Sequence, residues 1–166
     1  GGDDIIIGGD GNDVIDGGIG TNRLYGDAGD DTITSAGTND VVDAGEGNNN
    51  IIISGTANGG TYTSGDGNDS YIIQEDASGT SSFNSGDGVD TFTFESGFEG
   101  RANIDAGDNG VKTLNLNGGE VYQWSSGSGD DVITSSIGTV LSSSRWDGGL
   151  RTNAGNDTIT LDGELR

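Results

Sequence analysis

The chain has 166 residues, of which 34 are glycine and only 29% are apolar, and its formal charge is −22. It contains no histidine and no cysteine, which excludes Cys/His zinc sites, thiol and Ser-His-Asp catalysis, haem ligation and disulfides. Composition of this kind is typical of disorder, so the carboxylates need a counter-charge, such as a divalent metal, before the chain can compact.

The same composition limits the partners. Six basic residues stand against 28 acidic ones, so nucleic acid and anionic lipid are disfavoured. No apolar run approaches the roughly 18 residues that cross a bilayer, and we expect no membrane insertion.

Nonapeptides in one register occupy residues 1 to about 52. In the clearest three, from Gly8 to Thr34, a glycine opens each unit and another falls at position four, with Asp or Asn at position six and an aliphatic residue at position eight. Glycine allows the positive φ angles of tight turns, so each unit predicts a turn followed by a short strand. Position eight holds the inward-pointing Ile6, Ile15, Leu24, Ile33, Val42 and Ile51, and position six holds Asp4, Asp13, Asn22, Asp31, Asp40 and Asn49.

Two nonapeptides make one coil of a solenoid, so successive turns alternate between two edges. After Ile53 the acidic turn continues on one edge only, from Ser64, Ser85, Ala106, Ser126 and Asn153, with Asp69, Asp90, Lys112, Asp131 and Asp157 at position six. The other half-coils keep an inward residue, for which we expect Tyr62, Phe83, Ile104, Tyr122 or Trp146. We also expect Trp124 and Trp146 to fill the core, which is favoured over stacking on sugars.

These spacings resemble the repeats-in-toxin (RTX) family, whose consensus is GGxGxDxUx with U aliphatic. The resemblance implies an all-β, right-handed parallel β-roll or β-solenoid. We expect about eight coils, with regular 18-residue coils at the N-terminal end that widen to 20–26 residues. We expect one domain over residues 1–166, divided into a regular part (1–53) and a part with widened coils and one calcium-type edge (54–166).

The resemblance also implies several Ca²⁺ ions held between stacked turns. Hard cations prefer oxygen ligands, which glycine carbonyls and position-six carboxylates supply. The alternative is that the aspartates merely favour turns, but in-register carboxylates about 5 Å apart would repel one another without a cation. The expected ligands are Asp4, Gly9, Gly11, Asp13, Gly29, Asp31, Asp40, Gly65, Gly67, Asp69, Gly86, Gly88, Asp90, Gly127, Gly129, Asp131, Gly155 and Asp157.

Some turns depart from the regular pattern of ligands, and we expect different sites there. Asp4, Asn22 and Asp40 should form a short ladder on the second edge, and sites that use the neutral Asn22 or Asn49 should be weaker. Lys112 replaces a ligand, so its turn should lack a normal site, although Asp108 could contribute.

The resemblance implies a calcium-binding module of a secreted bacterial protein, exported unfolded by type I machinery and folded by Ca²⁺ outside the cell. Because the chain starts inside a repeat, we expect it to be an excerpt of a longer protein with flanking domains. The alternative is a structural or adhesive subunit that associates end to end, because open solenoid ends expose strand edges. We expect no enzyme activity, since the few basic residues are scattered.

Overall fold

A computed structural model describes residues 1–54, 57–98, 100–118, 120–136, 140–141 and 149–162. All the named elements in these residues are β-strands, and the strands pair only in parallel. The described residues contain no helix of the length and apolarity needed to cross a membrane. The expected all-β parallel β-solenoid is confirmed.

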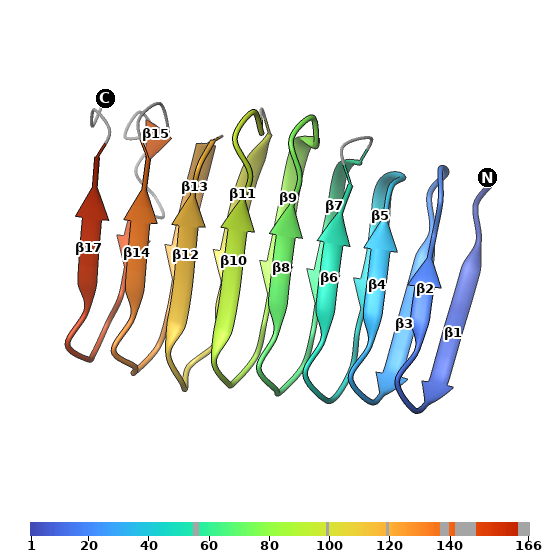
Figure 1. Ribbon diagram of the computed structural model, residues 1–166, viewed down its shortest axis with the longest axis horizontal. Coiled ribbons are helices and arrows are strands. Elements are labelled where there is room, and N and C mark those ends of the chain that lie inside the picture. Colours follow the sequence, from blue (N-terminus) through green and yellow to red (C-terminus); the bar gives the residue numbers. More distant parts are fainter. Residues whose placement is uncertain (55–56, 99, 119, 137–139, 142–148, 163–166) are drawn as a thin grey trace.

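Two sheets lie face to face and run the length of the molecule (Figure 1). The first sheet contains β1 (Ile5–Asp10), β3 (Arg23–Ala28), β5 (Thr38–Asp43), β7 (Asn58–Thr63), β9 (Ser78–Asn84), β11 (Arg101–Asp105), β13 (Glu120–Ser125) and β15 (Val140–Leu141), with β16 (Gly149–Arg151) also paired to β13. The second sheet contains β2 (Val14–Asp16), β4 (Thr32–Ser35), β6 (Asn50–Ile53), β8 (Ser70–Ile73), β10 (Asp90–Phe94), β12 (Lys112–Leu116), β14 (Val132–Ser135) and β17 (Thr158–Leu161).

The core consists of columns of side chains that stack in register between the two sheets. In the first sheet one column runs through Leu24, Val42, Tyr62, Phe83, Ile104 and Trp124, and in the second sheet another runs through Ile15, Ile33, Ile51, Tyr71, Phe92, Leu114 and Ile133. All of these side chains are buried. The position-eight residues therefore point inward, as strand alternation predicts.

Trp124 continues the inward column of the first sheet. A register shift between Ala102 and Asn103 pairs Ile104 with Trp124. The side chain of Tyr122, also expected to point inward, lies outside the described residues. Trp124 is 1% exposed, so its expected place in the core is confirmed. Trp146 lies outside the described residues.

Aromatic residues fill the wider coils. Tyr62 stacks on Phe83 and Tyr71 stacks on Phe92, with ring centroids 5.1 and 4.6 Å apart. Phe92 meets the edge of Trp124 across the core at 5.6 Å. These contacts fit the preferred stacked and edge-to-face geometries of aromatic pairs and fill the extra volume between the sheets.

The two edges of the solenoid differ. The acidic edge, which we define as the turns 8–13, 26–31, 44–49, 64–69, 85–90, 106–112, 126–131 and 152–157, joins each strand of the first sheet to the next strand of the second sheet and lies at the bottom of Figure 1. On the opposite edge, three turns after residue 53 are closed by main-chain hydrogen bonds from Ala57, Ala77 and Phe98 to the residue three positions earlier.

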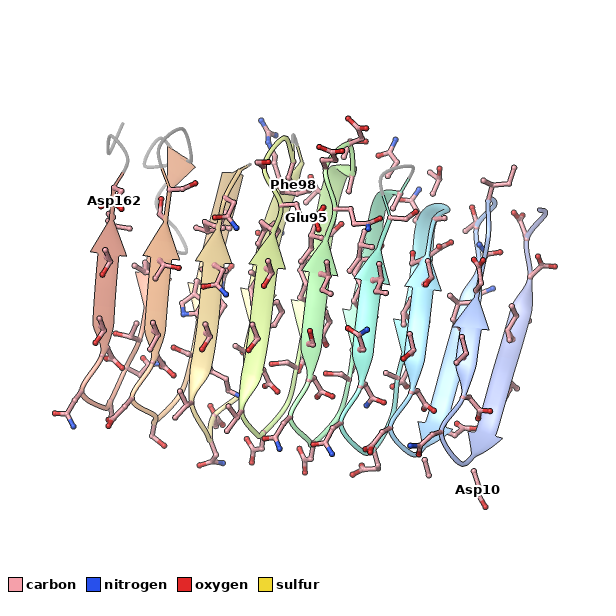
Figure 2. The ribbon with its side chains drawn as sticks, in the orientation of Figure 1. Asp10, Glu95, Phe98 and Asp162 are labelled. Atoms are coloured by element: carbon pink, nitrogen blue, oxygen red, sulfur yellow. The ribbon has the colours of Figure 1, made fainter. Side chains whose placement is uncertain are left out.

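These three closing residues are buried, at 2%, 2% and 5% exposure. Phe98 packs on Phe94 with ring centroids 5.1 Å apart, and Figure 2 labels it beside Glu95. In these three coils a buried apolar residue therefore takes the place of the acidic turn on the opposite edge.

Candidate metal-binding edge

The position-six side chains of the acidic edge form a hydrogen-bonded ladder. The Oδ1 atom of Asp31 accepts from the main-chain N–H of Asp13 at 2.8 Å, and Asn49 accepts in the same way from Asp31 at 3.0 Å. The ladder continues from Asn49 to Asp69 at 2.7 Å and from Asp69 to Asp90 at 3.0 Å. The side chains of Asp31, Asn49, Asp69 and Asp90 thus each hold the preceding coil, which explains why Asp or Asn recurs at this position.

The number of residues between successive position-six side chains shows how the coils widen. It is 18 residues from Asp13 to Asp31, 20 from Asn49 to Asp69, 21 from Asp69 to Asp90 and 26 from Asp131 to Asp157. The coil from Lys112 to Asp131 is shorter than expected, at 19 residues. The ladder tolerates these differences because the additional residues, apart from Asn109 in the turn 106–112, lie outside the acidic turns.

Two carboxylate oxygens in the described part of this edge are buried without a hydrogen-bond donor. They are Oδ2 of Asp13 and Oδ2 of Asp31, and the Asp31 residue as a whole is 0% exposed. A buried charged oxygen without a partner is costly, and buried charges are normally paired or bound to a metal. Both oxygens therefore fit a bound cation.

Glycine at position one leaves space beside each of these oxygens. A Cβ on Gly8 would lie 2.6 Å from Asp13 Oδ2. A Cβ on Gly26 would contact both Asp31 Oδ2 and the main-chain oxygen of Ala44, which opens the next turn. The space at Gly26 is thus bordered by a carboxylate of one coil and a carbonyl of the next, which is the donor chemistry that Ca²⁺ prefers.

Asn49 shows which carbonyls converge in such a turn. Its Nδ2 donates to the carbonyls of Gly45 and Gly47, both at 3.3 Å, and to that of Ser64 at 3.5 Å. These are the carbonyls at positions two and four of its own turn and at position one of the next turn. A partly positive amide group occupies this place in the Asn49 turn, and in the Asp31 turn the corresponding position-one carbonyl of the next coil is that of Ala44.

Three later turns satisfy the second carboxylate oxygen with a serine at position one. Ser64 donates to Asp69 Oδ2 and Ser85 to Asp90 Oδ2, both at 2.7 Å, and Ser126 donates to Asp131 Oδ2 at 2.6 Å. The change from glycine to serine at position one is visible in the sequence. Its meaning was missed because only the structure shows that this hydroxyl reaches the carboxylate five residues later.

Of the expected glycine ligands, most adopt the left-handed conformation that favours glycine. Those with positive φ are Gly9, Gly11, Gly29, Gly65, Gly67, Gly86, Gly88 and Gly155, whereas Gly127 and Gly129 are not among them. A Cβ on Gly29 would contact the main-chain oxygen of Gly11 in the preceding coil. These glycines allow close stacking of backbones as well as the turn itself.

The opposite edge places its three expected residues differently. Asp4 is exposed, whereas Asn22 and Asp40 are buried. Asn22 Oδ1 accepts from Asp4 N at 3.1 Å, and Asp40 Oδ1 accepts from Asn22 N at 2.7 Å, so the three form a short hydrogen-bonded ladder. Metal binding by these three residues stays a prediction. Asp40 Oδ2 already accepts from Ser35 Oγ at 2.7 Å and from Gly37 N at 3.1 Å, so it resembles the serine-containing turns.

The last turn of the acidic edge and the turn that contains Lys112 differ from the others. Asp157 Oδ1 accepts from Asp131 N at 3.1 Å and is half-buried. Lys112 is buried and forms an ion pair with Asp90, whereas Asp108 is exposed. In the described residues no three acidic side chains gather into a metal-binding cluster, so any cation here would depend on main-chain carbonyls for most of its ligands.

Burial within the ladder changes the electrostatics of one carboxyl. Desolvation is the largest cause that raises the pKa of Asp69, to about 6, and the hydrogen bonds from Asn49 and Ser64 oppose it in part. The outward-facing Asp87 shows the reverse, because its hydrogen bond from the Asn109 side chain lowers its pKa. A raised pKa identifies Asp69 as a carboxyl whose charged form is poorly stabilised by the protein alone.

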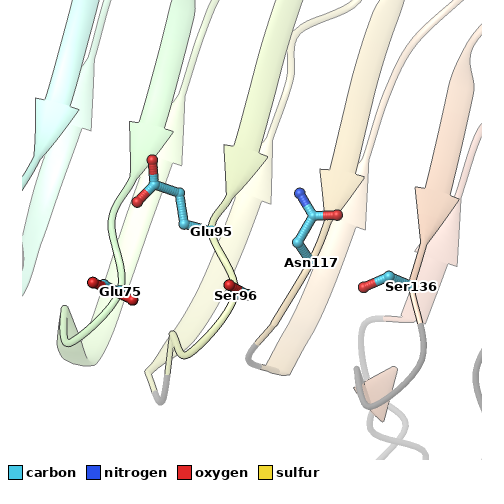
Figure 3. A pocket seen from close by; sticks show the side chains of 5 residues that line it. All are labelled: Glu75, Glu95, Ser96, Asn117 and Ser136. Atoms are coloured by element: carbon cyan, nitrogen blue, oxygen red, sulfur yellow. The ribbon is translucent and has the colours of Figure 1, made fainter.

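A shallow surface depression outside the acidic edge lacks the buried, donor-free oxygens found at Asp13 and Asp31. It lies on the opposite edge and is lined by Glu75, Glu95, Ser96, Asn117 and Ser136, which come from successive coils (Figure 3). Glu75 and Ser96 are exposed, and no buried polar atom without a partner was found among these lining residues.

The fold and this edge together define a parallel β-solenoid with stacked, oxygen-rich turns. The family model described as RTX calcium-binding nonapeptide repeat (4 copies) matches residues 1–23 and 17–51. Residues 1–51 are therefore RTX repeats, and the resemblance noted in the sequence is confirmed there. Comparisons with curated proteins and with solved structures found no match. Family and fold together support a calcium-binding β-roll module.

Proposed function

We propose that this chain is a calcium-dependent folding module in which Asp13 and Asp31 are the principal metal ligands. The observation that carries the proposal is the pair of buried Oδ2 atoms without donors, each beside a glycine at position one. Both lie in the segment that matches the RTX repeat. Bound calcium would supply the positive counter-charge that the surroundings of these two carboxylates do not provide.

The position-six ladder explains how binding is coupled to folding. Asp31 lies between two coils, because its Oδ1 accepts from Asp13 N of the preceding coil and its Oδ2 borders the same space at Gly26 as the Ala44 carbonyl of the next coil. A cation at this place would hold consecutive coils together, so the binding free energy becomes folding free energy. Without it, the carboxylates of the first coils repel one another and favour extension of residues 1–53.

The proposal extends to the remaining expected ligands, where we expect weaker calcium binding. Asp69, Asp90 and Asp131 each have a serine hydroxyl on Oδ2, and Asp40 has two donors there. Calcium at these turns would compete with an existing hydrogen bond. We therefore expect the tightest sites between residues 8 and 49.

We further propose that the parent protein is secreted and that this module folds outside the cell. Sites of this kind with affinities of about 10⁻⁴ to 10⁻³ M would be empty in a cytosol with sub-micromolar calcium and filled outside. Export by type I machinery and end-to-end association both remain predictions from the family resemblance and the open strand edges.

A calcium titration followed by far-UV circular dichroism tests the proposal. We expect the β signal to increase with calcium, and hydrogen exchange to slow in residues 1–53. A signal and an exchange pattern that are the same in excess chelator and in millimolar calcium would refute it. Magnesium is the control, because its stricter octahedral geometry and firmly held water suit this carbonyl cradle poorly.

A further inference from the structure

Lys112 is the single lysine of the chain and it lies inside the acidic edge. It takes position six of the turn 106–112, where most other turns have Asp or Asn. Its side chain is 0% exposed, as is that of its partner Asp90. A charged ammonium is rarely buried completely, so its surroundings must supply compensating charge and hydrogen bonds.

The Lys112 ammonium is held by the preceding turn. Nζ donates to the carbonyl of Gly86 at 2.8 Å and to Asp90 Oδ2 at 2.6 Å. These groups are the position-two carbonyl and the position-six carboxylate of the turn 85–90. The same carbonyl position receives the side-chain amide in two other turns, from Asn49 to Gly45 and from Asn22 to Gly18.

Asp90 needs no further counter-charge. Its Oδ1 accepts from Asp69 N at 3.0 Å, and its Oδ2 accepts from Ser85 at 2.7 Å as well as from Lys112. The Asp31 carboxylate has the same Oδ1 ladder bond, and neither Asp31 nor Asp13 has a donor on Oδ2. The difference between the two kinds of turn is thus the presence of hydroxyl and ammonium donors within the chain.

An inserted residue makes this arrangement possible. Asn109 lengthens the turn, so that Asp90 and Lys112 are 22 residues apart and the main-chain N–H of Asp90 bonds to Val111 O at 3.1 Å instead of to a position-six carboxylate. Asn109 is itself fixed by its side-chain bond to Asp87 at 2.7 Å. The position-six side chain is thereby released from the ladder bond and extends back toward Gly86.

We propose that the Lys112 ammonium is an internal cation that takes the place of a bound metal between the coils of Asp90 and Lys112. The acidic edge then has two parts: a metal-dependent part around Asp13 and Asp31, and a part from Ser64 to Asp131 that the chain's own hydroxyls and Lys112 hold without metal. The inference stands independently of calcium binding in the first part.

The first test is hydrogen exchange in excess chelator, with peptides that cover residues 85–94 and 106–116. We expect protection in the unsubstituted chain and its loss in both peptides on Lys112→Met, which keeps most of the side-chain stem but removes the charge. Arg23→Met, an equal charge change at an exposed position, is the control and should leave both peptides protected. Free exchange of these peptides in the unsubstituted chain, or unchanged protection in Lys112→Met, would overturn the proposal.

The second test counts bound calcium at saturation by equilibrium dialysis and elemental analysis. Lys112→Ala vacates the place beside Gly86 O and Asp90 Oδ2, and we expect it to bind one more calcium ion per chain than the unsubstituted protein. Arg23→Ala should bind the unsubstituted number. An equal count for Lys112→Ala would show that the ammonium does not occupy a cation site. Failure of the proposed function would look different, with no calcium bound by the unsubstituted chain.

Discussion

Gly26 and Asp31 face each other across one turn of the acidic edge, so that a Cβ on Gly26 would contact the donor-free Oδ2 of Asp31. In the equivalent turn of the next-but-one coil, Ser64 occupies the glycine position and donates to Asp69 Oδ2 at 2.7 Å. The residue at position one therefore decides how the second carboxylate oxygen is satisfied. Serine supplies a hydrogen bond from the chain itself, whereas glycine leaves the oxygen to a bound cation.

Asp31→Asn tests whether the carboxylate without a donor is a calcium ligand. The amide replaces a charged oxygen with a donor that faces carbonyls, as Asn49 does with Gly45 and Gly47. We expect the variant to be more stable in chelator by about 1 to 3 kcal/mol, because an unsatisfied buried group is removed. We also expect a smaller stabilisation by calcium. Thermal unfolding with and without calcium measures both changes.

Asp162→Asn is the control for this variant, since it makes the same charge change at an exposed position outside the acidic turns, labelled in Figure 2. Its response to calcium should match that of the unsubstituted chain. If Asp31→Asn keeps the full calcium response, Asp31 is not a principal ligand.

Ser64→Ala tests the serine-containing turns. The substitution removes the donor to Asp69 Oδ2 and leaves the hydroxyl of Tyr71 without its 2.7 Å partner. We expect a loss of about 1 to 3 kcal/mol in chelator, because a buried carboxylate oxygen loses its hydrogen bond. Urea unfolding measures the loss. Ser82→Ala, on the exposed face of β9, should change stability by less than about 0.5 kcal/mol.

A pH dependence in the calcium-free protein follows from Asp69. Its pKa in the folded chain is about 6, above the usual 3.8, because burial disfavours the charged form. The folded state therefore binds the proton more tightly than the unfolded state. We expect the folded fraction in chelator to increase as pH falls from above 6 toward 4, and this contribution to be lost as pH rises through 6.

Circular dichroism at a series of pH values in chelator measures this dependence. Asp69→Asn is the matched variant, because it cannot ionise and should show a smaller increase on acidification. Identical pH profiles for the two proteins would contradict the assignment to Asp69.

Gly29→Ala tests the contact between coils. Gly29 has φ of 143°, and a Cβ there would contact the main-chain oxygen of Gly11. We expect a loss of more than about 4 kcal/mol, because strain and a backbone clash combine. Gly11→Ala is the control at the same position of the preceding turn, where φ is 116° and nothing lies within 4 Å of the added Cβ. It should cost only about 1 to 2 kcal/mol, the strain alone. Equal unfolding free energies for the two variants in calcium would show that coil stacking does not depend on this contact.

The sequence by itself determined the solenoid and the inward columns. The nine-residue spacing of glycine, Asp or Asn and an aliphatic residue requires a turn and a short strand, and strand alternation then directs Ile15, Ile33 and Ile51 inward. The same spacing identified one acidic edge that continues past Ile53. These features depend on local backbone geometry and period, which a sequence displays directly.

Tertiary structure alone decided how each carboxylate is satisfied. The Oδ2 atom of Asp31 has no donor, that of Asp69 has a serine hydroxyl, and that of Asp90 has a serine hydroxyl and an ammonium group, although the three turns share the same position-six residue. The partners belong to position one of the same turn or to the next coil, and their distances depend on how coils of 18 to 22 residues stack. The pairing of Ile104 with Trp124 depends likewise on a register shift between strands, which no pattern within one strand reveals.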